Sequence, residues 1–522
     1  MNDYADLPHI FPTVVDLLAD AAHRAPHHPA LEMGEETLTY SDYLSCVAGF
    51  AQELRDLGTV GERVALVMGN SIDIAIAMFG AHAAGAQVVP LNPMYTAREL
   101  GEILVDAEPH VVVYDDAAAP HVKPLLAECR IAVGLHIGQE GGRRLTAWAG
   151  QQMALPQPLP QPDQLATLQY TGGTTGLPKG VNITHGQIAL NIAQREALLP
   201  TRPEQERLLC VMPMFHVYAV AMALHLTAYC RGTLVILPRY RPDWVLEALE
   251  QRRITLFPGS PTIYTGLMQY EGFAETDFSA LRLCYSGAER LPEDTLKAWE
   301  QATGCTTLEG FGQSEAGPVL SFNPEHGAHK ALSVGHAVPH TEIEIVDIET
   351  GAKTLPAREP GEIRARGPQL MSGYRNRSEE TAETLRDGWL YTGDLGYLDE
   401  EGYLFIVGRK KEMVIVGGFN VYPREIEELL CAHEEILEAA VVGAPDDYRG
   451  EQLRAYVGLR PASQLDEEQL RAYCTQNLVK YKVPAVFEIM TALPRTTVGK
   501  IDKKALVAQA STGAGKGQEV SA

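Results

Sequence analysis

The sequence predicts an α/β fold: a large N-terminal domain of doubly wound sheets with a small barrel-like β subdomain, then a small α+β C-terminal domain. A chain of 522 residues is too long for one hydrophobic core. Strand and helix patterns alternate along its first part, and the strand patterns are continuous apolar runs. Such runs are typical of parallel strands that helices cover on both faces.

The N-terminal part supplies the clearest elements. Apolar runs predict strands at Arg63–Met68, Gln87–Leu91 and His110–Tyr114. Between them, Ile72–Ala84 is expected to be a buried helix, and Thr96–Asp106 a helix capped by its threonine. Each of the first two strands is thus followed by a helix, as in a parallel sheet.

The alternation resumes after a connector rich in Pro and Gln at residues 151–164. Further strands are expected at Arg207–Met212, Thr233–Leu237, Thr255–Pro258 and Leu281–Ser286. Two segments that alternate more strictly, Glu342–Asp347 and Gly361–Gly367, are assigned to the smaller barrel or sheet. A hairpin at Tyr397–Val407, with its turn at Asp399–Gly402, is expected to close the N-terminal part.

The charged run Arg409–Glu412 is suited to be a hinge. We therefore expect an N-terminal domain at residues 1–408 and a C-terminal domain at residues 409–508. The remainder, residues 509–522, is rich in Gly, Ser and Ala and is predicted to be a disordered tail.

Composition excludes some classes of function. The formal net charge of −24 disfavours a nucleic-acid partner, because a phosphate backbone would be repelled. The eight cysteines include no Cys-x-x-Cys pair, which argues against zinc or a disulfide framework and suits a reducing compartment.

The start of the chain has no basic and then apolar signal pattern. The most apolar stretch, Ile72–Pro90, is interrupted by Asp73, His82 and Gln87, whereas a spanning helix needs roughly 20 apolar residues. We therefore expect no stable membrane insertion and a cytoplasmic protein.

The most informative segment is Tyr170–Val181, which contains four glycines, three threonines and one lysine. Glycine lets the main chain approach an anion, and successive N–H groups can form an anion-binding nest. Lys179 adds a point charge suited to phosphate. The spacing does not match a Walker P-loop, so a phosphate-binding loop of another kind is predicted.

Other clusters follow in a fixed order, and together they resemble the adenylate-forming (AMP-binding) superfamily of acyl- and aryl-CoA ligases, adenylation domains and luciferases. They are Pro213–Tyr218, Gly310–Glu315, Tyr391–Asp394, Gly417–Pro423 and Pro494–Lys500. The resemblance extends from about residue 10 to 508. Thr171-Gly172-Gly173 and the run Arg409–Pro423 favour the fatty-acyl-CoA synthetase branch.

The resemblance implies a ligase that uses ATP and Mg²⁺ to convert a carboxylic acid, with a medium- or long-chain fatty acid favoured, into an acyl-adenylate and then transfers the acyl group to coenzyme A. Lys500 resembles the catalytic lysine, and His216 the residue that orients the substrate. Glu315 resembles the acid that holds Mg²⁺, a hard ion that prefers oxygen ligands.

The implied ATP contacts come from the glycine loop, the adenine segment, the Gly-Phe-Gly-Gln-Ser cluster and the ribose pair: Thr171, Gly172, Gly173, Thr174, Thr175, Gly176, Lys179, Ala288, Glu289, Phe311, Gly312, Gln313, Ser314, Asp394 and Arg409. Glu289 departs from the small residue or Pro usual there. Phe311 is equally consistent with a core aromatic.

The resemblance also implies that the C-terminal domain is mobile. It would rotate at Lys411 and bring Gly417 and Gly418 to a narrow pantetheine tunnel, where a Cβ would not fit. Tyr218, Gly287 and Gly312 are expected to line the acyl pocket. The sequence leaves chain length undetermined and allows a homodimer.

Several alternatives remain. An aryl-CoA ligase similar to 4-coumarate-CoA ligase, or an enzyme that loads an acyl carrier protein, would share these motifs. Gly312–Ala316 approaches the hydrolase pattern Gly-x-Ser-x-Gly, but Ala316 breaks it. A nucleotide-binding regulator without turnover is disfavoured by Lys500, Glu315 and Asp394.

Overall fold

The computed structural model describes residues 4–171, 178–287, 289, 291–416, 419–446, 450–461, 463–496 and 500–513. The chain forms two compact units. The first comprises Met1–Leu291, Thr295–Ile343 and Ala365–Leu390, and the second Pro292–Asp294, Glu344–Arg364 and Tyr391–Ala522. Each is described separately.

The first unit contains a nine-stranded sheet whose central strands, from β13 to β1, are parallel. Its order is β15 (His336–Ala337), β14 (Val319–Phe322), β13 (Thr306–Gly312), β12 (Leu283–Ser286), β11 (Leu256–Gly259), β9 (Arg207–Cys210), β10 (Thr233–Ile236), β1 (Pro29–Met33) and β2 (Glu36–Thr39).

A seven-stranded sheet completes the first unit and is parallel from β7 to β6. Its order is β18 (Gly373–Tyr374), β8 (Lys179–Thr184), β7 (Leu165–Thr171), β4 (Gln87–Leu91), β3 (Arg63–Val67), β5 (Val111–Tyr114) and β6 (Val133–His136).

Alternate residues of these strands enter different cores, because successive side chains of a strand point to opposite faces. Val64 and Leu66 of β3 join the largest core, whereas Ala65 and Val67 join a second one. The largest core also takes Leu208 of the nine-stranded sheet. Helices therefore cover both faces of both sheets, which confirms the predicted doubly wound fold.

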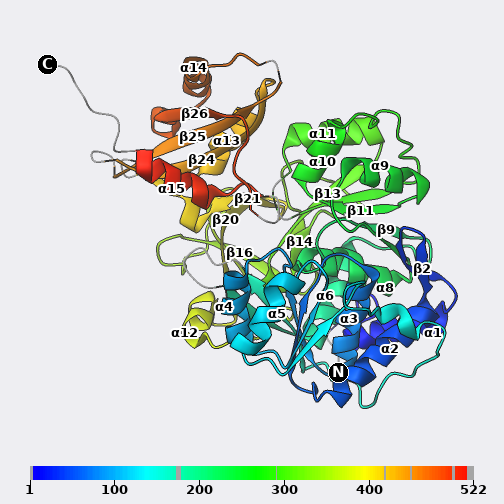
Figure 1. Cartoon of the computed structure of the whole chain (residues 1–522). Helices are drawn as coiled ribbons and strands as arrows, with labels where there is room; N and C mark the ends of the chain where they lie inside the picture. The colour runs from blue at the N-terminus through cyan, green and yellow to red at the C-terminus, as the bar shows by residue number, and fades with distance from the viewer. Residues whose placement is uncertain are drawn as a thin grey trace. The chain divides into compact units, whose positions relative to one another are not determined.

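The helices divide among these layers (Figure 1). The shared core contains α1 (Val14–Arg24), α2 (Tyr40–Asp56), α3 (Ile72–Ala84), α6 (His185–Leu198) and α8 (Leu226–Cys230). The outer faces carry α4 (Ala97–Ala107) and α5 (Ala119–Glu128) on the smaller sheet, and α9 (Pro242–Gln251), α10 (Pro261–Met268) and α11 (Glu293–Thr303) on the larger one. Helix α12 (Ser378–Thr384) lies beside β18.

Local chemistry explains the predicted helices. Helix α3 spans the predicted residues: the Ser71 hydroxyl caps its start, and Gly85, at φ +81°, ends it in a left-handed conformation that favours glycine. Thr96 forms a capping box with Glu99 at the start of α4.

Two further sheets have five strands each. One has the order β16 (Glu342–Val346), β17 (Gly361–Arg366), β20 (Trp389–Leu398) and β19 (Leu385–Arg386), with β21 (Leu404–Arg409) beside β20. The other has β23 (Phe419–Val421), β22 (Val414–Val416), β25 (Gly450–Leu459) and β24 (Ile436–Asp446), with β26 (Val486–Met490) beside β25. The predicted hairpin is the β20–β21 pair, and the Asp399 carboxylate accepts backbone bonds in its turn.

Three helices accompany the last sheet: α13 (Pro423–Cys431), α14 (Glu467–Asn477) and α15 (Lys503–Gly513). The predicted tail is therefore corrected at its beginning, because α15 continues past residue 509. Leu506 and Ala510 of this helix are fully buried in a small apolar cluster, which gives the segment a reason to fold.

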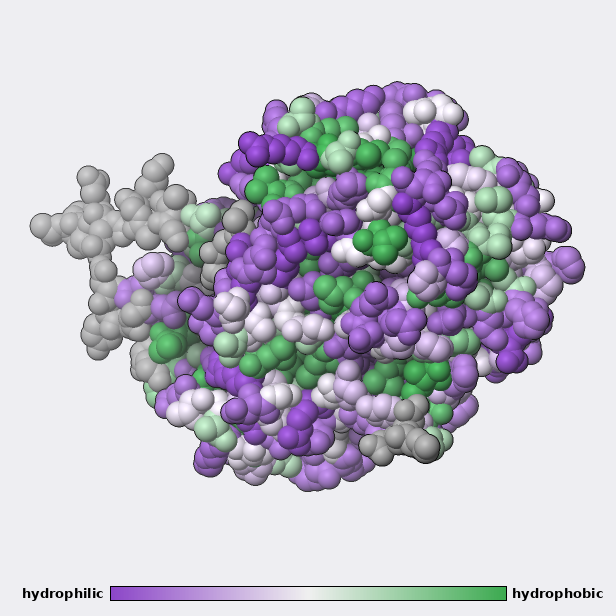
Figure 2. Space-filling model, turned by 90° about the horizontal axis from the view of Figure 1, so that it is seen from below, coloured by the Kyte–Doolittle hydropathy of each residue, from purple (hydrophilic) through white to green (hydrophobic). Residues whose placement is uncertain are grey.

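The face of the molecule in Figure 2 carries hydrophilic side chains with apolar ones scattered between them. This mixture is ordinary for a folded protein surface. No helix of the described residues is long and apolar enough to cross a bilayer.

Candidate active site

The glycine loop connects two strands that pair with each other. Strands β7 and β8 are antiparallel and are in register up to Thr171 and Lys179, and the Thr171 hydroxyl lies 3.5 Å from the Lys179 carbonyl oxygen. The five predicted phosphate contacts between them, Gly172, Gly173, Thr174, Thr175 and Gly176, lie outside the described residues and stay predictions.

Two predicted site residues of the first unit are linked by a third that the sequence did not reveal. The Lys179 ammonium lies 5.1 Å from the ring centroid of Tyr374. The Tyr374 hydroxyl donates a 2.7 Å hydrogen bond to Glu315, whose carboxylate is buried. Burial, and then the Glu315 carboxylate, raise the pKa of Tyr374 well above its usual value, so the phenol keeps its proton.

Backbone hydrogen bonds position Tyr374. Strand β18 pairs with β8 so that Tyr374 is opposite Val181. Met371 N–H donates to the Glu315 carbonyl, and Arg375 N–H to the Gly180 carbonyl, each at 2.8 Å. The segment therefore fixes the lysine and the glutamate relative to each other.

Glu315 follows β13 in the short 3₁₀ helix η3 (Ser314–Ala316). Gln313 N–H donates a 3.0 Å hydrogen bond to the Pro318 carbonyl. A Cβ on Gly312 would lie 2.0 Å from that same oxygen, so glycine is required for close backbone packing. Phe311 is half-buried against an apolar cluster, and its stacking on adenine stays a prediction.

His216 stands at the start of α7 (Val217–Ala219), where its Nδ1 atom accepts a 3.3 Å hydrogen bond from Tyr218 N–H. Tyr218 donates its hydroxyl to the Tyr285 carbonyl at 3.0 Å. A Cβ on Gly287 would lie 2.9 Å from the Tyr218 ring. Two of the residues predicted for the acyl pocket are thus in contact.

Beside these residues lies a cavity of about 30 Å³ that includes Val217, Ser314 and Pro318 in its lining. It does not include the predicted pocket residues Tyr218, Gly287 and Gly312. No periodic pattern identifies its lining residues, because they come from strands and helices far apart in the sequence.

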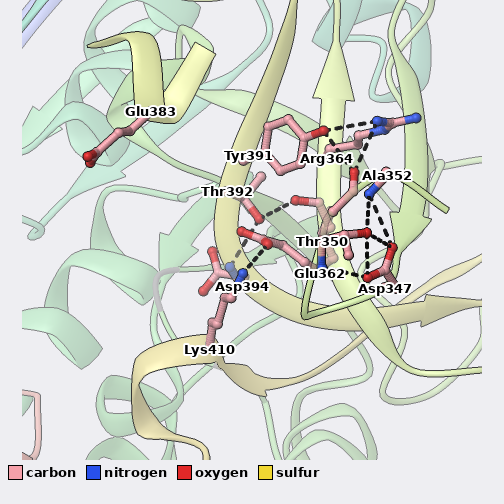
Figure 3. A network of polar contacts seen from close by, with 12 residues as sticks. Asp347, Thr350, Ala352, Glu362, Arg364, Glu383, Tyr391, Thr392, Asp394 and Lys410 are labelled. Atoms are coloured by element: carbon pink, nitrogen blue, oxygen red, sulfur yellow. Dashed lines mark hydrogen bonds and ion pairs between the residues drawn. The ribbon is translucent and has the colours of Figure 1, made fainter. Parts of the chain in front are cut away.

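The second unit holds the ribose pair. Asp394 on β20 faces Arg409 on β21, and the Arg409 Nε atom lies 3.2 Å from Asp394 Oδ1. Asp394 N–H donates to the Thr392 hydroxyl (Figure 3). Burial raises the pKa of the Asp394 carboxyl, although the Arg409 and Lys411 cations oppose this effect.

Figure 3 also shows an ion pair between Lys410 and Glu362 at 2.7 Å. Lys411 belongs to the 3₁₀ turn η4 (Lys410–Glu412), and desolvation and the Arg409 cation lower its pKa.

The backbone of Lys500 lies beside Thr496. Its N–H donates to the Thr496 hydroxyl at 3.2 Å, its carbonyl accepts from Thr496 N–H at 2.7 Å, and Arg495 pairs with Ile501. Ala288 of the adenine segment and Gly417 and Gly418 of the predicted tunnel lie outside the described residues. Glu289 is described, and its adenine contact stays a prediction.

Comparison with known proteins agrees with this fold. The family model "AMP-binding enzyme" matches residues 18–375, and "AMP-binding enzyme C-terminal domain" matches residues 425–500. The chain is 37% identical to a long-chain-fatty-acid–CoA ligase of Bacillus subtilis, with 96% of each chain covered. It is 34% identical to one of Escherichia coli O6:H1, with 96% and 95% covered.

Solved structures agree as well. ATP-bound MatB from Rhodopseudomonas palustris superposes with a TM-score of 0.87 at 33% identity over 95% of this chain and 98% of that one. The anthranilate CoA ligase AuaEII with anthranoyl-AMP gives a TM-score of 0.90 at 28% identity over 98% and 99%.

The two large sheets, the paired strands β7 and β8 on either side of the glycine loop, and the C-terminal sheet are those of an adenylate-forming enzyme. The chain belongs to the AMP-binding enzyme family.

Proposed function

We propose that the protein is an AMP-forming acid–thiol ligase that converts a fatty acid into its coenzyme A thioester. The observation that carries this proposal is the similarity to long-chain-fatty-acid–CoA ligases along 96% of the chain. A solved relative described as containing ATP and another containing an acyl-AMP support the same two-step chemistry.

In the first step a carboxylate oxygen attacks the α-phosphorus of ATP, and pyrophosphate leaves as the P–O bond breaks. Two anions must approach, so positive charge and N–H donors have to stabilise the transition state. We assign phosphate binding to Thr171–Lys179, with Lys179 held over the ring of Tyr374. We assign the bridging charge between the carboxylate and the α-phosphate to Lys500.

Glu315 fits a magnesium ion that is bound to the phosphates. Its carboxylate is a hard oxygen donor, and Tyr374 fixes its orientation. The described residues contain no cluster of three metal-binding side chains. Mg²⁺ is usually bound by only one or two protein carboxylates together with the phosphates of the substrate. When bound, the ion would neutralise phosphate charge.

In the second step the thiol sulfur of coenzyme A attacks the acyl carbonyl carbon, the thiol proton is released, and AMP leaves. We propose that Asp394 and Arg409 bind the ribose, and that His216 orients the acyl carboxylate. We keep the division into residues 1–408 and 409–508 as functional domains, with Lys411 as the hinge and Gly417–Gly418 as part of the pantetheine channel.

Pyrophosphate release across carboxylic acids from acetate to long-chain fatty acids and cinnamates, with and without coenzyme A, tests the proposal. We expect release with fatty acids and thioester only when coenzyme A is present. A preference for cinnamates would favour the aryl-CoA ligase alternative. Thioester formation on a carrier protein but not on coenzyme A would favour a carrier-loading enzyme.

A further inference from the structure

The end of helix α4 is hydrogen-bonded to the strand that leads into the glycine loop. The last turn of this helix contains Asp106, whose side chain is 18% exposed. The Tyr170 hydroxyl donates a 2.6 Å hydrogen bond to Asp106 Oδ2. Tyr170 is on β7, directly before Thr171, where that strand ends. A side chain of α4 thus holds the strand on one side of the loop.

Arg375 connects the same helix end to the strand that leaves the loop. Its Nε–H donates a 2.8 Å hydrogen bond to the backbone carbonyl of Asp106. Its backbone N–H donates to the carbonyl of Gly180 on β8, also at 2.8 Å. Gly180 directly follows Lys179, and Arg375 directly follows Tyr374, over whose ring the Lys179 ammonium lies. Both strands that border the loop are therefore bonded to one network at the end of α4.

The two strands also pack closely against each other at this point. Tyr170 is opposite Gly180 in the β7–β8 pair. A Cβ on Gly180 would lie 2.8 Å from a Leu168 methyl group and 3.2 Å from Cζ of the Tyr170 ring, the carbon that carries the hydroxyl. The position of this ring is therefore coupled to the main chain beside Lys179, and the bond to Asp106 fixes that position.

Helix stability does not explain why an acidic residue stands at this place. A helix C-terminus carries partial negative charge, so a carboxylate in the last turn is disfavoured there. Arginines offset this charge: Arg63 and Arg375 donate to backbone carbonyls at the end of α4, and an Arg377 nitrogen lies 3.8 Å from Asp106 Oδ1. The bond that Asp106 accepts from Tyr170 gives the carboxylate a use that the helix itself does not.

Tyr170 keeps the proton that makes this bond. Burial, and then the Asp106 carboxylate, raise the pKa of Tyr170 well above its usual value. Hydrogen bonds from a hydroxyl to an ionised oxygen are shorter and stronger than neutral ones, with lengths of about 2.5–2.7 Å. The distance of 2.6 Å between Tyr170 and Asp106 lies in that range. The pair is therefore a strong, directional link between helix and strand.

We infer that Asp106 is a positioning residue for the β- and γ-phosphates of ATP, because it holds through Tyr170 the strand that enters the glycine loop, while Arg375 holds the strand that leaves it. The inference rests on the proposed ligase function, in which this loop binds phosphate. ATP contains these two phosphates, whereas AMP and acyl-AMP do not. The link between Asp106 and Tyr170 therefore supports the first half reaction and has no part in the second.

The test compares the Kd for ATP with the Kd for AMP, measured by calorimetric titration of the full chain in the presence of Mg²⁺. Asp106→Ala and Tyr170→Phe each remove the hydrogen bond, and each is expected to weaken ATP binding about tenfold, the worth of one hydrogen bond to a charged group. AMP binding, and thioester formation from supplied acyl-AMP, are expected to be unchanged. The double variant is expected to bind ATP no more weakly than the weaker single variant, because both remove the same interaction.

Asp106→Asn is the conservative variant, since its amide oxygen still accepts a hydrogen bond from Tyr170, and it is expected to keep most of the ATP affinity. Tyr229→Phe is the matched control, because it removes a 3.1 Å hydroxyl bond to the His9 carbonyl instead, and its ATP affinity is expected to equal that of the wild type. Equal weakening of ATP and AMP binding in Asp106→Ala and Tyr170→Phe, or unchanged ATP binding in both, would overturn the inference alone. A wild-type protein that binds neither nucleotide would overturn the proposed function first.

Discussion

Among single residues, a few charged side chains have proposed roles that experiments can separate. Lys500 is assigned to the first step alone. Lys500→Ala is therefore expected to reduce acyl-adenylate formation by roughly 10²–10³-fold, the usual effect of removing one electrostatic contact to a transition state. Thioester formation from supplied acyl-AMP should be nearly unchanged.

Pyrophosphate release and thioester formation, measured separately, check this prediction. Lys353→Ala, an exposed lysine of the same unit, serves as the control. Equal loss of both steps in Lys500→Ala would contradict the assigned role.

Tyr374 offers a matched pair of variants. Tyr374→Phe removes the 2.7 Å hydrogen bond to Glu315 but keeps the ring under Lys179. A hydrogen bond to a charged group is worth about 1.5–3 kcal/mol, so the Mg²⁺ concentration for half-maximal activity is expected to rise roughly tenfold or more. Tyr374→Leu loses both contacts and should also raise the KM for ATP. A magnesium titration unaffected in both variants would refute the link.

Asp394 is expected to lower folding stability at neutral pH while it supports ATP binding. The folded-state pKa of the Asp394 carboxyl is raised, chiefly by burial. The contribution of this carboxyl to folding stability is therefore fully present below its unfolded-state pKa and is lost as the pH rises through its folded-state pKa. Asp394→Asn should therefore raise the melting temperature at pH 7, and the gain should vanish in acid. ATP affinity should fall about tenfold to a hundredfold. Calorimetry from pH 4 to pH 7 is the measurement; a lower melting temperature at neutral pH contradicts this account.

At the element scale, close backbone packing positions the site. A Cβ on Gly312 would meet the Pro318 carbonyl, which cannot yield as a flexible side chain would. Gly312→Ala is expected to lower the free energy of unfolding by about 1–3 kcal/mol, as overpacking does. It is also expected to weaken Mg²⁺ binding, because a shift of the adjacent η3 would move Glu315.

Urea unfolding checks that value. Gly101→Ala on α4 is the control, because its nearest neighbour beyond the helix, a Leu125 methyl, is at 3.4 Å and alanine favours helices. An unfolding curve of Gly312→Ala that matches the wild type would contradict the packing argument.

Elements with strong local signals could be predicted from sequence. Helix α3 and strand β4 have the predicted residues because caps and continuous apolar runs mark them. The end of α15 was missed, since Ala510 is held by tertiary burial and not by any local signal. Tyr374 was missed for a related reason, because sheet topology brings it to Glu315 and the spacing of residues along the sequence does not encode that topology. The same holds for the residues that line the cavity together with Ser314.

At the scale of the whole molecule, the proposal requires two catalytic arrangements of one chain. Lys411→Pro restricts the backbone at the proposed hinge. It is expected to leave adenylate formation within about twofold and to slow thioester formation by at least tenfold.

Lys411→Ala removes the same side chain but keeps the backbone freedom, so it should retain most thioester formation. Single-turnover measurements of each half reaction distinguish the two variants. Unchanged thioester formation in Lys411→Pro would count against a hinge at this position.

The reaction on which both half steps depend is the joining of a carboxylic acid to AMP. It can be measured by mass-spectrometric detection of the mixed anhydride after incubating the purified enzyme with ATP, Mg²⁺ and carboxylic acids from acetate to long-chain fatty acids and cinnamates, with coenzyme A omitted. We expect stoichiometric acyl-AMP with matching pyrophosphate. Detection of neither product with any acid would contradict it.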